Sequence, residues 1–287
     1  MDFVRVSIIF NLRIAESIYL LRLFLKDKMT VSIPGQFVHL RVGAFDQTPL
    51  PSYDLLLRRP FSIHQHQGRT LEILYKVVGR GTEILSKKLP HEELDLLGPL
   101  GQGFFLPPTG EEMKWEGEPL IVAGGMGIAP LLFLAKRIKS ASPLVLIGAK
   151  TKKNIFGENE FKKMGIKTLV ATEDGSRGFK GMVTELLKKY LSTINYKLLT
   201  IIYTCGPWEM LRKIAAISAE WKIPCQVSLE GQMACGVGAC QGCVIKCWRA
   251  ADFTSEKSKA DRKEGEIVYK RICCDGPVFN SKQVVWQ

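Results

Sequence analysis

The sequence contains no hydrophobic run long enough to cross a membrane. Its most apolar stretch, residues 119–135, is shorter than the ~20 residues that a spanning helix needs, and it contains three glycines and an internal proline. We also expect no signal peptide. We therefore expect no membrane anchor and a cytoplasmic location, where cysteine thiols stay reduced.

Histidine is also scarce, with 4 residues in 287. His64 and His66 would share one face of a strand, but no third ligand accompanies them, so the pair does not favour a metal site. No Ser/His/Asp arrangement and no paired-carboxylate site stands out in the chain. The sequence therefore offers no candidate for a hydrolytic centre.

A nucleic-acid-binding motif is missing as well, although the formal net charge is +12. Lys and Arg occur in short groups, such as Lys87-Lys88 and Lys162-Lys163, with acidic residues between them. A basic face that binds nucleic acid would instead be clustered. We expect no nucleic-acid partner, because solvated surface, phosphate-bearing cofactors and an acidic partner explain the charge more simply.

The sequence does contain a concentrated set of cysteines near its C-terminus. Cys235, Cys240 and Cys243 have the spacing C-x4-C-x2-C, and Cys273 follows thirty positions later. This is the pattern of plant-type ferredoxins, in which four thiolates hold a 2Fe-2S cluster. The intervening glycines let the loop curl and turn its amide N–H groups toward the sulfurs.

A structural zinc site and buried free thiols are the alternatives for these cysteines. Zinc usually joins two pairs of closely spaced ligands, whereas the pattern here is three ligands plus one. The spacing therefore favours iron and sulfide, which indicates electron transfer without indicating the reaction.

The chain, with 287 residues and 46% hydrophobic composition, is long enough for two ordinary domains and a small appendage. In its first part, short β-type runs punctuated by Gly and Pro indicate an antiparallel barrel or sandwich. These runs cover residues 4–10, 18–25, 37–42, 61–64, 70–78 and 95–97.

The pattern changes after a predicted linker at residues 107–112. Strands then alternate with helices, which builds a parallel sheet with helices on both faces. The expected strands are 120–123, 144–149, 167–172 and 200–204, and the expected helices are 130–140, 159–164, 182–190 and 208–221. Because the chain becomes Cys- and Gly-rich beyond Pro224, we predict three domains, residues 1–108, 109–222 and 223–287.

Two turns that follow strands of the second domain are candidates for nucleotide binding. In both, small residues connect a strand to a helix, so backbone N–H groups can approach phosphates at the edge where ligands bind. The first motif, Gly125-x-Gly127-x-x-Pro130, ends in Pro where the dinucleotide fingerprint Gly-x-Gly-x-x-Gly has its third Gly. A purely structural turn therefore remains an alternative. A lone cysteine such as Cys205 is more often a buried small hydrophobe. The candidates are Gly124, Gly125, Gly127, Cys205, Gly206 and Pro207.

The first domain offers three further segments. Arg58-Arg59-Pro60-Phe61-Ser62 combines a forked guanidinium with a hydroxyl, which suits a diphosphate. Leu74-Tyr75-Lys76 offers an aromatic platform and a cation, and Gly79-Arg80-Gly81-Thr82 is an amide-rich turn. An edge strand with a basic surface and an ordinary turn is the alternative interpretation.

The order of these motifs resembles the ferredoxin reductase superfamily, in which an FAD-binding barrel precedes a nicotinamide domain. The C-terminal part is similar to the electron-transfer subunit of type B dihydroorotate dehydrogenase. This similarity rests on Val227-Ser-Leu-Glu230, Met233-Ala-Cys-Gly236 and Ile272-Cys-Cys-Asp-Gly-Pro-Val-Phe279, together with the three-cysteine segment. The resemblance covers nearly the whole chain.

The resemblance implies the cofactors FAD, a 2Fe-2S cluster and NAD, and an FMN-containing catalytic subunit as partner in a heterotetramer of two plus two. Electrons would pass from the partner's FMN through the cluster and FAD to NAD+, in the synthesis of UMP. The FAD-binding residues that it implies are Arg59, Pro60, Phe61, Ser62, Leu74, Tyr75, Lys76, Gly81 and Thr82. The cluster ligands that it implies are Cys235, Cys240, Cys243 and Cys273, and Cys205 would lie near the nicotinamide.

The fourth cluster ligand has competitors. The family motif Cys-x-Asp-Gly-Pro matches Cys273-Cys274-Asp275-Gly276-Pro277, which favours Cys273 over Cys274 and Cys247. The connection from Cys243 to Cys273 carries a charged insertion, residues 256–264, which leaves the identity of this ligand open.

Other functions share these features. A free-standing NAD(P)H-dependent reductase and the reductase subunit of a sulfur-reducing or hydrogenase-type complex have the same folds, and a non-enzymatic module with a structural zinc is a third alternative. The residues do not decide between NAD and NADP, because Lys150, Lys152 and Lys153 after the second strand fit either. The resemblance favours NAD.

Overall fold

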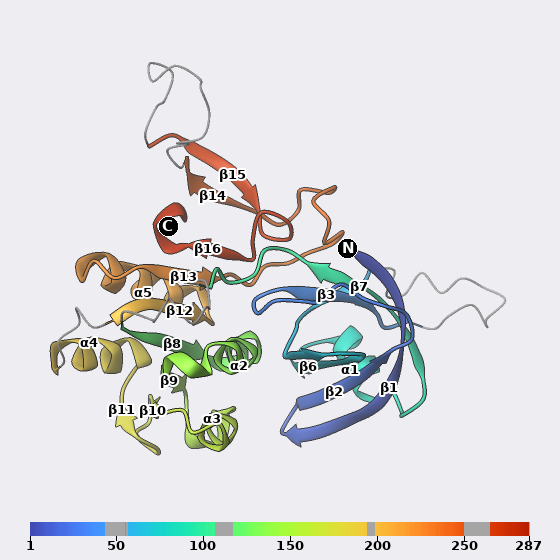
Figure 1. The fold of residues 1–287 in the computed structure, drawn as a ribbon, viewed down its shortest axis with the longest axis horizontal. Coiled ribbons are helices and arrows are strands. Elements are labelled where there is room, and N and C mark those ends of the chain that lie inside the picture. Colours follow the sequence, from blue (N-terminus) through green and yellow to red (C-terminus); the bar gives the residue numbers. More distant parts are fainter. Residues whose placement is uncertain (44–54, 56, 107–116, 194–198, 250–264, 287) are drawn as a thin grey trace.

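The structure, a computed structural model, comprises two sheets and a C-terminal hairpin (Figure 1). It describes residues 1–43, 55, 57–106, 117–193, 199–249 and 265–286. The predicted linker at residues 107–112, the predicted boundary between residues 108 and 109, and the insertion at residues 256–264 lie outside the described residues.

The first sheet, called the barrel sheet here, is antiparallel and has the strand order β4-β3-β7-β1-β2-β6-β5. Its strands follow an alternating pattern, as in β1, where Val4, Val6 and Ile8 are buried while Phe3 and Arg5 are exposed or partly exposed. The strands are β1 (Asp2–Ala15), β2 (Ile18–Leu25), β3 (Phe37–Arg41), β4 (Arg59–Ser62), β5 (Gln65–Gln67), β6 (Thr70–Lys76) and β7 (Glu93–Leu100).

A short helix, α1 (Arg80–Ser86), follows the barrel strand β6, where the sequence predicted only an amide-rich turn. Thr82 closes its first turn, because its Oγ1 accepts hydrogen bonds from the N–H groups of Val78 and Gly79 at 2.9 and 3.2 Å. The predicted turn at residues 79–82 is therefore the beginning of a helix.

The second sheet, called the parallel sheet here, has the strand order β11-β10-β9-β8-β12-β13-β16. All neighbours are parallel except β13 and β16, which are antiparallel. The strands are β8 (Glu118–Gly124), β9 (Leu144–Ala149), β10 (Thr168–Thr172), β11 (Phe179–Lys180), β12 (Leu199–Cys205), β13 (Cys225–Ser228) and β16 (Val278–Asn280). The predicted alternation of strands and helices is confirmed.

Helices cover both faces of the parallel sheet because its central strands are apolar on both sides. Along β8, Leu120 and Val122 share a core with α4 and α5, whereas Ile121 and Ala123 share another core with α2 and α3. The helices are α2 (Ile128–Arg137), α3 (Glu158–Lys163), α4 (Val183–Thr193) and α5 (Trp208–Glu220), with 3-10 turns at Gly125–Gly127, Lys139–Ala141, Lys152–Asn154 and Ser281–Gln283. None of the helices in the described ranges combines the length and apolar character of a membrane span.

The C-terminal segment is inserted between two strands of the parallel sheet. After β13 the chain forms the loop that carries Cys235, Cys240 and Cys243, then the hairpin of β14 (Val244–Trp248) and β15 (Ile267–Arg271), and returns as β16 (Figure 1). The parallel sheet therefore takes strands from both sides of the predicted boundary at residues 222 and 223.

Candidate cofactor sites

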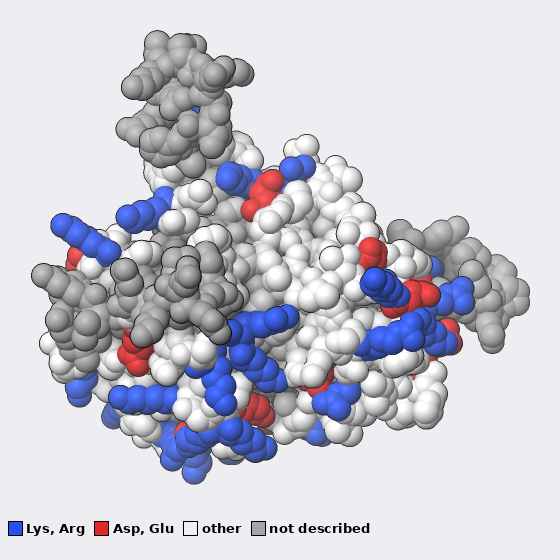
Figure 2. All heavy atoms as spheres, in the orientation of Figure 1, with Lys and Arg blue, Asp and Glu red and all other residues white. Residues whose placement is uncertain are grey.

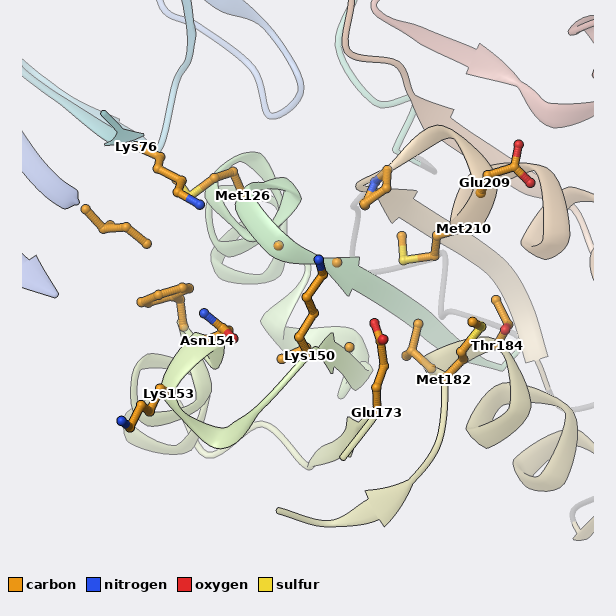
Figure 3. Close-up of a pocket in the computed structure, with 18 of the residues that line it drawn as sticks. Lys76, Met126, Lys150, Lys153, Asn154, Glu173, Met182, Thr184, Glu209 and Met210 are labelled. Atoms are coloured by element: carbon orange, nitrogen blue, oxygen red, sulfur yellow. The ribbon is translucent and has the colours of Figure 1, made fainter. Parts of the chain in front are cut away.

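A cavity of about 840 Å³, called the strand-end cavity here, lies at the carboxyl ends of strands of the parallel sheet (Figure 3). Open α/β sheets bind their ligands at this edge, and the volume is within the usual range for cofactor sites. Four of the predicted residues, Lys76, Gly124, Gly125 and Pro207, line it. Lys76 from the barrel sheet closes one side, so the cavity lies between the two sheets.

The remaining predicted residues of this region lie beneath the cavity and hold its floor together. A Cβ atom added to Gly127 would overlap the backbone oxygen of Cys205, and one added to Gly206 would lie 2.5 Å from Met210 Cε. The turns after β8 and β12 are therefore in backbone contact, which only glycine allows at these points.

Cys205 itself does not open into the cavity. Its side chain is 2% exposed, and burial raises the pKa of its thiol far above the ordinary value. Ser228, its neighbour across β12 and β13, is its hydrogen-bonding partner. The thiol is therefore protonated at neutral pH, so it is not available as a thiolate nucleophile.

Charged side chains around the strand-end cavity were only partly found from the sequence. Lys150, Lys153 and Lys213 line it and provide attraction for phosphate groups. Glu173, which follows β10, extends into the cavity next to Lys150 (Figure 3). Sequence reasoning missed Glu173 and Lys213, although their positions, directly after a strand and on the helix that begins at Trp208, were a usable signal.

On the barrel sheet, the structure brings Arg59 and Gly81 together. A Cβ atom added to Gly81 would lie 3.0 Å from Arg59 Nε, so the guanidinium stem packs over the first turn of α1. Arg59 Nη1 donates a hydrogen bond of 2.6 Å to the Leu57 oxygen. The predicted segments at β4 and at residues 81–82 are thus adjacent, as binding of one ligand would require.

The three predicted residues of β6 face different surroundings. Tyr75, which the sequence indicated as an aromatic platform, is 3% exposed and lies in the barrel core. Its hydroxyl donates a 3.0 Å hydrogen bond to Asn11, and its ring meets Phe61 edge-on at 5.8 Å. Leu74 packs into the core shared with α2, and only Lys76 reaches the cavity. The Tyr75 ring therefore packs inside the barrel and leaves no free face there for a ligand.

The four predicted cluster ligands stand in two pairs. The Cys240 N–H donates to Cys235 Sγ at 3.4 Å, and the Cys273 N–H donates to Cys243 Sγ at 3.4 Å. Cys235 and Cys240 are partly or fully exposed, whereas Cys243 and Cys273 are buried. In this structure all eight cysteines are free.

Backbone N–H groups surround the thiols of residues 235–243, called the thiol loop here. Burial alone would raise the pKa of Cys235, but the N–H groups of Cys240 and Val237 outweigh it and lower the pKa to about 6. The Gly242 N–H donates to Cys240 Sγ at 3.4 Å. Donors that stabilise thiolates are what an iron-sulfur cluster needs from its protein.

Cys273 and Cys274 differ in their surroundings. Cys273 is 1% exposed and adjoins both the Cys243 thiol and the Gly238 amide. The Cys274 thiol also lies against Gly238, because a Cβ atom there would be 2.7 Å from its Sγ. Cys247 is fully buried in β14 within the hydrophobic core.

This arrangement fits a two-iron cluster better than a single ion. Each iron of a 2Fe-2S cluster shares two sulfides and takes two thiolates, so two thiol pairs match two irons. The described residues contain no group of three His, Cys, Asp or Glu arranged to hold one metal ion.

Comparisons with known proteins agree with the fold and with the thiol loop. Residues 121–216 match the family described as the oxidoreductase NAD-binding domain, and residues 230–285 match the iron-sulfur cluster binding domain of dihydroorotate dehydrogenase B. The solved structure of an NADH-dependent reduced ferredoxin-NADP oxidoreductase superposes with a TM-score of 0.75, at 28% identity over 98% of this chain and 90% of that one.

A ferredoxin NADP+ reductase from Neisseria gonorrhoeae shares the fold, with a TM-score of 0.61 at 17% identity over 77% of this chain and 92% of that one. The barrel sheet, the parallel sheet and the strand-end cavity thus define an oxidoreductase of the ferredoxin reductase type.

The electron transfer subunit of dihydroorotate dehydrogenase B (NAD(+)) from Desulforamulus reducens is 38% identical over 96% of this chain and 95% of its own length. The subunit of the same name from Fusobacterium nucleatum is 36% identical over 96% and 95%. The chain belongs to the family of dihydroorotate dehydrogenase B electron transfer subunits.

Proposed function

We propose that this chain passes electrons from the FMN of a dihydroorotate dehydrogenase catalytic subunit, through a 2Fe-2S cluster and FAD, to NAD+ in the synthesis of UMP. The observation that carries the proposal is the position of the thiol loop. It lies in the segment that connects β13 with β16 of the parallel sheet, and its residue Gly236 packs against His39 of the barrel sheet. One chain thus combines a thiol-rich loop with a dinucleotide cavity.

Cys235 and Cys240 hold one iron in this proposal, and Cys243 and Cys273 hold the other. The contacts within each pair support this division. Because the first pair is the more exposed one, it faces the side from which electrons of the partner arrive. The cluster supplies one-electron transfer, and the surrounding N–H groups set how readily it is reduced.

FAD occupies the barrel side of the proposed site. Arg59 and the adjacent first turn of α1 bind its diphosphate, and the proposed set is completed by Pro60, Phe61, Ser62, Leu74, Tyr75, Lys76, Gly81 and Thr82. Since Tyr75 is turned into the barrel core, it supports this site through packing and not through stacking on the ligand. The flavin supplies the exchange between single electrons and a hydride.

NAD+ occupies the strand-end cavity. Gly124, Gly125 and Pro207 line its floor, Gly127, Cys205 and Gly206 support it from beneath, and Lys150 attracts the phosphates.

The proposal further includes a heterotetramer of two plus two subunits and a cytoplasmic location, where thiol ligands stay reduced. The basic side chains of the face in Figure 2 form several groups with acidic ones between them.

Reconstitution with an FMN-containing catalytic subunit tests the proposal. Dihydroorotate-dependent reduction of NAD+ is expected in the mixture and not with this chain alone. Cys240→Ser should abolish it, whereas Cys225→Ser, which changes a buried thiol in β13 outside the thiol loop, should leave it unchanged.

A free-standing reductase is the competing function, because a ferredoxin-NADP oxidoreductase matches nearly the whole chain. NADH oxidation with a ferredoxin acceptor at the same rate with and without the catalytic subunit, combined with no orotate in the mixture, would favour that alternative. Pure protein without flavin absorption would contradict both.

A further inference from the structure

One buried histidine has no partner in the described part of the structure. His39 lies in β3 with its side chain fully buried, and neither Nδ1 nor Nε2 makes a hydrogen bond there. Buried polar groups in folded proteins are almost always hydrogen-bonded, so a buried ring without a protein partner usually has a ligand, an ion or water to bind.

The imidazole of His39 is neutral at physiological pH. Burial, together with the nearby positive charge of Arg58, lowers its pKa to about 4. Arg58 itself pairs with Asp95, with 3.6 Å between Nη2 and Oδ2, so Asp95 does not serve as a partner for the ring. A neutral imidazole carries one N–H donor and one acceptor nitrogen. His39 therefore holds one N–H that is available to an acceptor.

The edge of the ring that carries both nitrogens faces the start of the thiol loop. A Cβ atom added to Gly236 would lie 2.7 Å from both Cε1 and Nε2 of His39 and 3.0 Å from Nδ1. Gly236 follows the proposed ligand Cys235 directly and has a φ of 72°, so a side chain is excluded by both space and conformation. The loop thus approaches the imidazole as closely as its backbone allows.

The opposite neighbour of His39 is the proposed flavin strand. In the pairing of β3 with β4, His39 lies across from Pro60, between Arg59 and Phe61. His39 therefore contacts the thiol loop with its ring, while its strand pairs with the segment that we assign to FAD. The other described histidines have different surroundings, since His64 contacts the Ala129 oxygen, His66 contacts Ser32 and His91 is exposed.

We propose that His39 donates its N–H to a sulfur atom of the cluster held by the thiol loop, and that this hydrogen bond raises the reduction potential of the cluster. The inference rests on the proposed function, because it requires the cluster. A donor stabilises the additional negative charge of the reduced cluster, and hydrogen bonds to sulfur are among the factors that set such potentials. His39 is thus a tuning residue that favours uptake of an electron by the cluster from the partner.

Potentiometric titration of the holoprotein, followed by electron paramagnetic resonance of the reduced cluster, tests this role. His39→Leu removes the donor, and we expect a tenfold shift of the one-electron equilibrium toward the oxidised cluster, which is about 59 mV to more negative potential. His39→Gln keeps an N–H donor and should retain most of the wild-type potential. Iron, sulfide and FAD are quantified first in each protein.

An unchanged potential in His39→Leu with full cluster content would overturn the inference while leaving the proposed function intact. A wild-type protein without iron and sulfide would overturn both. If His39→Leu does not fold, pulsed resonance of wild-type protein labelled with ¹⁵N-histidine decides the question. A nitrogen coupling that is lost in His39→Gln supports the hydrogen bond, and the absence of any coupling refutes it.

Discussion

Cys273 and Cys274 are adjacent in the chain, but their thiols have different neighbours because they lie in a turn. The thiol of Cys273 adjoins the Cys243 thiol, whereas the Cys274 thiol lies against Gly238. Arg271 donates a hydrogen bond to Asp275 at 3.1 Å and so closes the turn that contains both cysteines. The conformation of this turn therefore determines which of the two thiols lies next to the Cys243 thiol.

We expect Cys273→Ser to lose the cluster and Cys274→Ser to keep it. The reason is that only the first change removes a member of a thiol pair. Iron and acid-labile sulfide per chain, together with visible absorption, measure the result. Loss of the cluster in Cys274→Ser, with normal content in Cys273→Ser, would reverse the proposed assignment.

Because three histidines are buried, we expect the free energy of unfolding to decrease in mild acid. Burial lowers the pKa of His39, His64 and His66, so below about pH 6.5 the unfolded chain binds protons that the folded chain does not. The free energy of unfolding should therefore be highest above pH 6.5 and decrease toward pH 4. For His39, whose pKa is about 4, the contribution is roughly 3 kcal/mol.

Urea unfolding at pH 8 and pH 4.5, followed by circular dichroism, measures this difference. His39→Gln should reduce the pH dependence, whereas His91→Asn, which changes an exposed histidine with a positive φ, should not. Equal pH dependence in wild type and His39→Gln would contradict the assignment of this histidine.

The residues that could be found from the sequence were those with a fixed spacing or a fixed place after a strand. The cysteine spacing indicated the four candidate cluster ligands, and the glycines after β8 indicated a candidate nucleotide-binding turn, two of whose glycines line the strand-end cavity. His39 carried no such signal, because a histidine within an apolar strand looks the same whether or not its ring has a partner. The orientation of Tyr75 depends on Asn11 and Phe61, which are distant in sequence.

The turns after β8 and β12 show how two elements position one cavity. At Gly127 the turn after β8 meets the backbone of Cys205 and Gly206 directly, beneath the proposed dinucleotide site. The sequence predicted both turns separately. Their contact was not predictable, because β8 and β12 are about 80 residues apart in the chain and become neighbours only through the strand order.

Gly127→Ala and Gly125→Ala should therefore behave differently although they belong to one turn. The first places a methyl group on the Cys205 backbone and should cost about 2–3 kcal/mol and weaken NAD+ binding. The second meets open space but has a φ of 53°, so it should cost about 1 kcal/mol through strain alone. Thermal unfolding and NAD+ titration measure the two effects. Equal losses would mean that the turns are not in contact.

The whole molecule is less modular than its sequence suggests. The order of barrel, parallel sheet and cysteine-rich segment was predictable, because hydrophobic period and composition change along the chain. The insertion of the thiol loop between β13 and β16 was not, because each strand has only a few residues and their pairing is long-range. The limits of the three predicted domains remain a prediction.

A chain that ends at residue 222 should not give a stable reductase. It lacks Val227, Leu229 and Phe279, which are buried in the core of the parallel sheet. Their burial contributes about 5–9 kcal/mol, comparable with the stability of a whole domain. We expect aggregation or a large decrease of Tm, measured by calorimetry. A stable, FAD-binding fragment 1–222 would contradict this.

A matched control shortens the same segment without removing the sheet strands. Arg249 donates its N–H to the Glu266 oxygen at 2.8 Å, so these two residues can flank a two-residue hairpin turn. Replacing residues 250–265 by Asn-Gly should leave Tm nearly unchanged and retain the cluster.

The route of the chain through the parallel sheet has a mechanical consequence. The segment that carries the proposed cluster ligands begins and ends in the parallel sheet, while Gly236 contacts His39 of the barrel sheet, to which we assign FAD. Any rotation between these two bodies when the dinucleotide enters would alter the gap across which electrons tunnel. Through this route of the chain, binding of the dinucleotide would change the rate of electron transfer between the proposed cluster and the flavin.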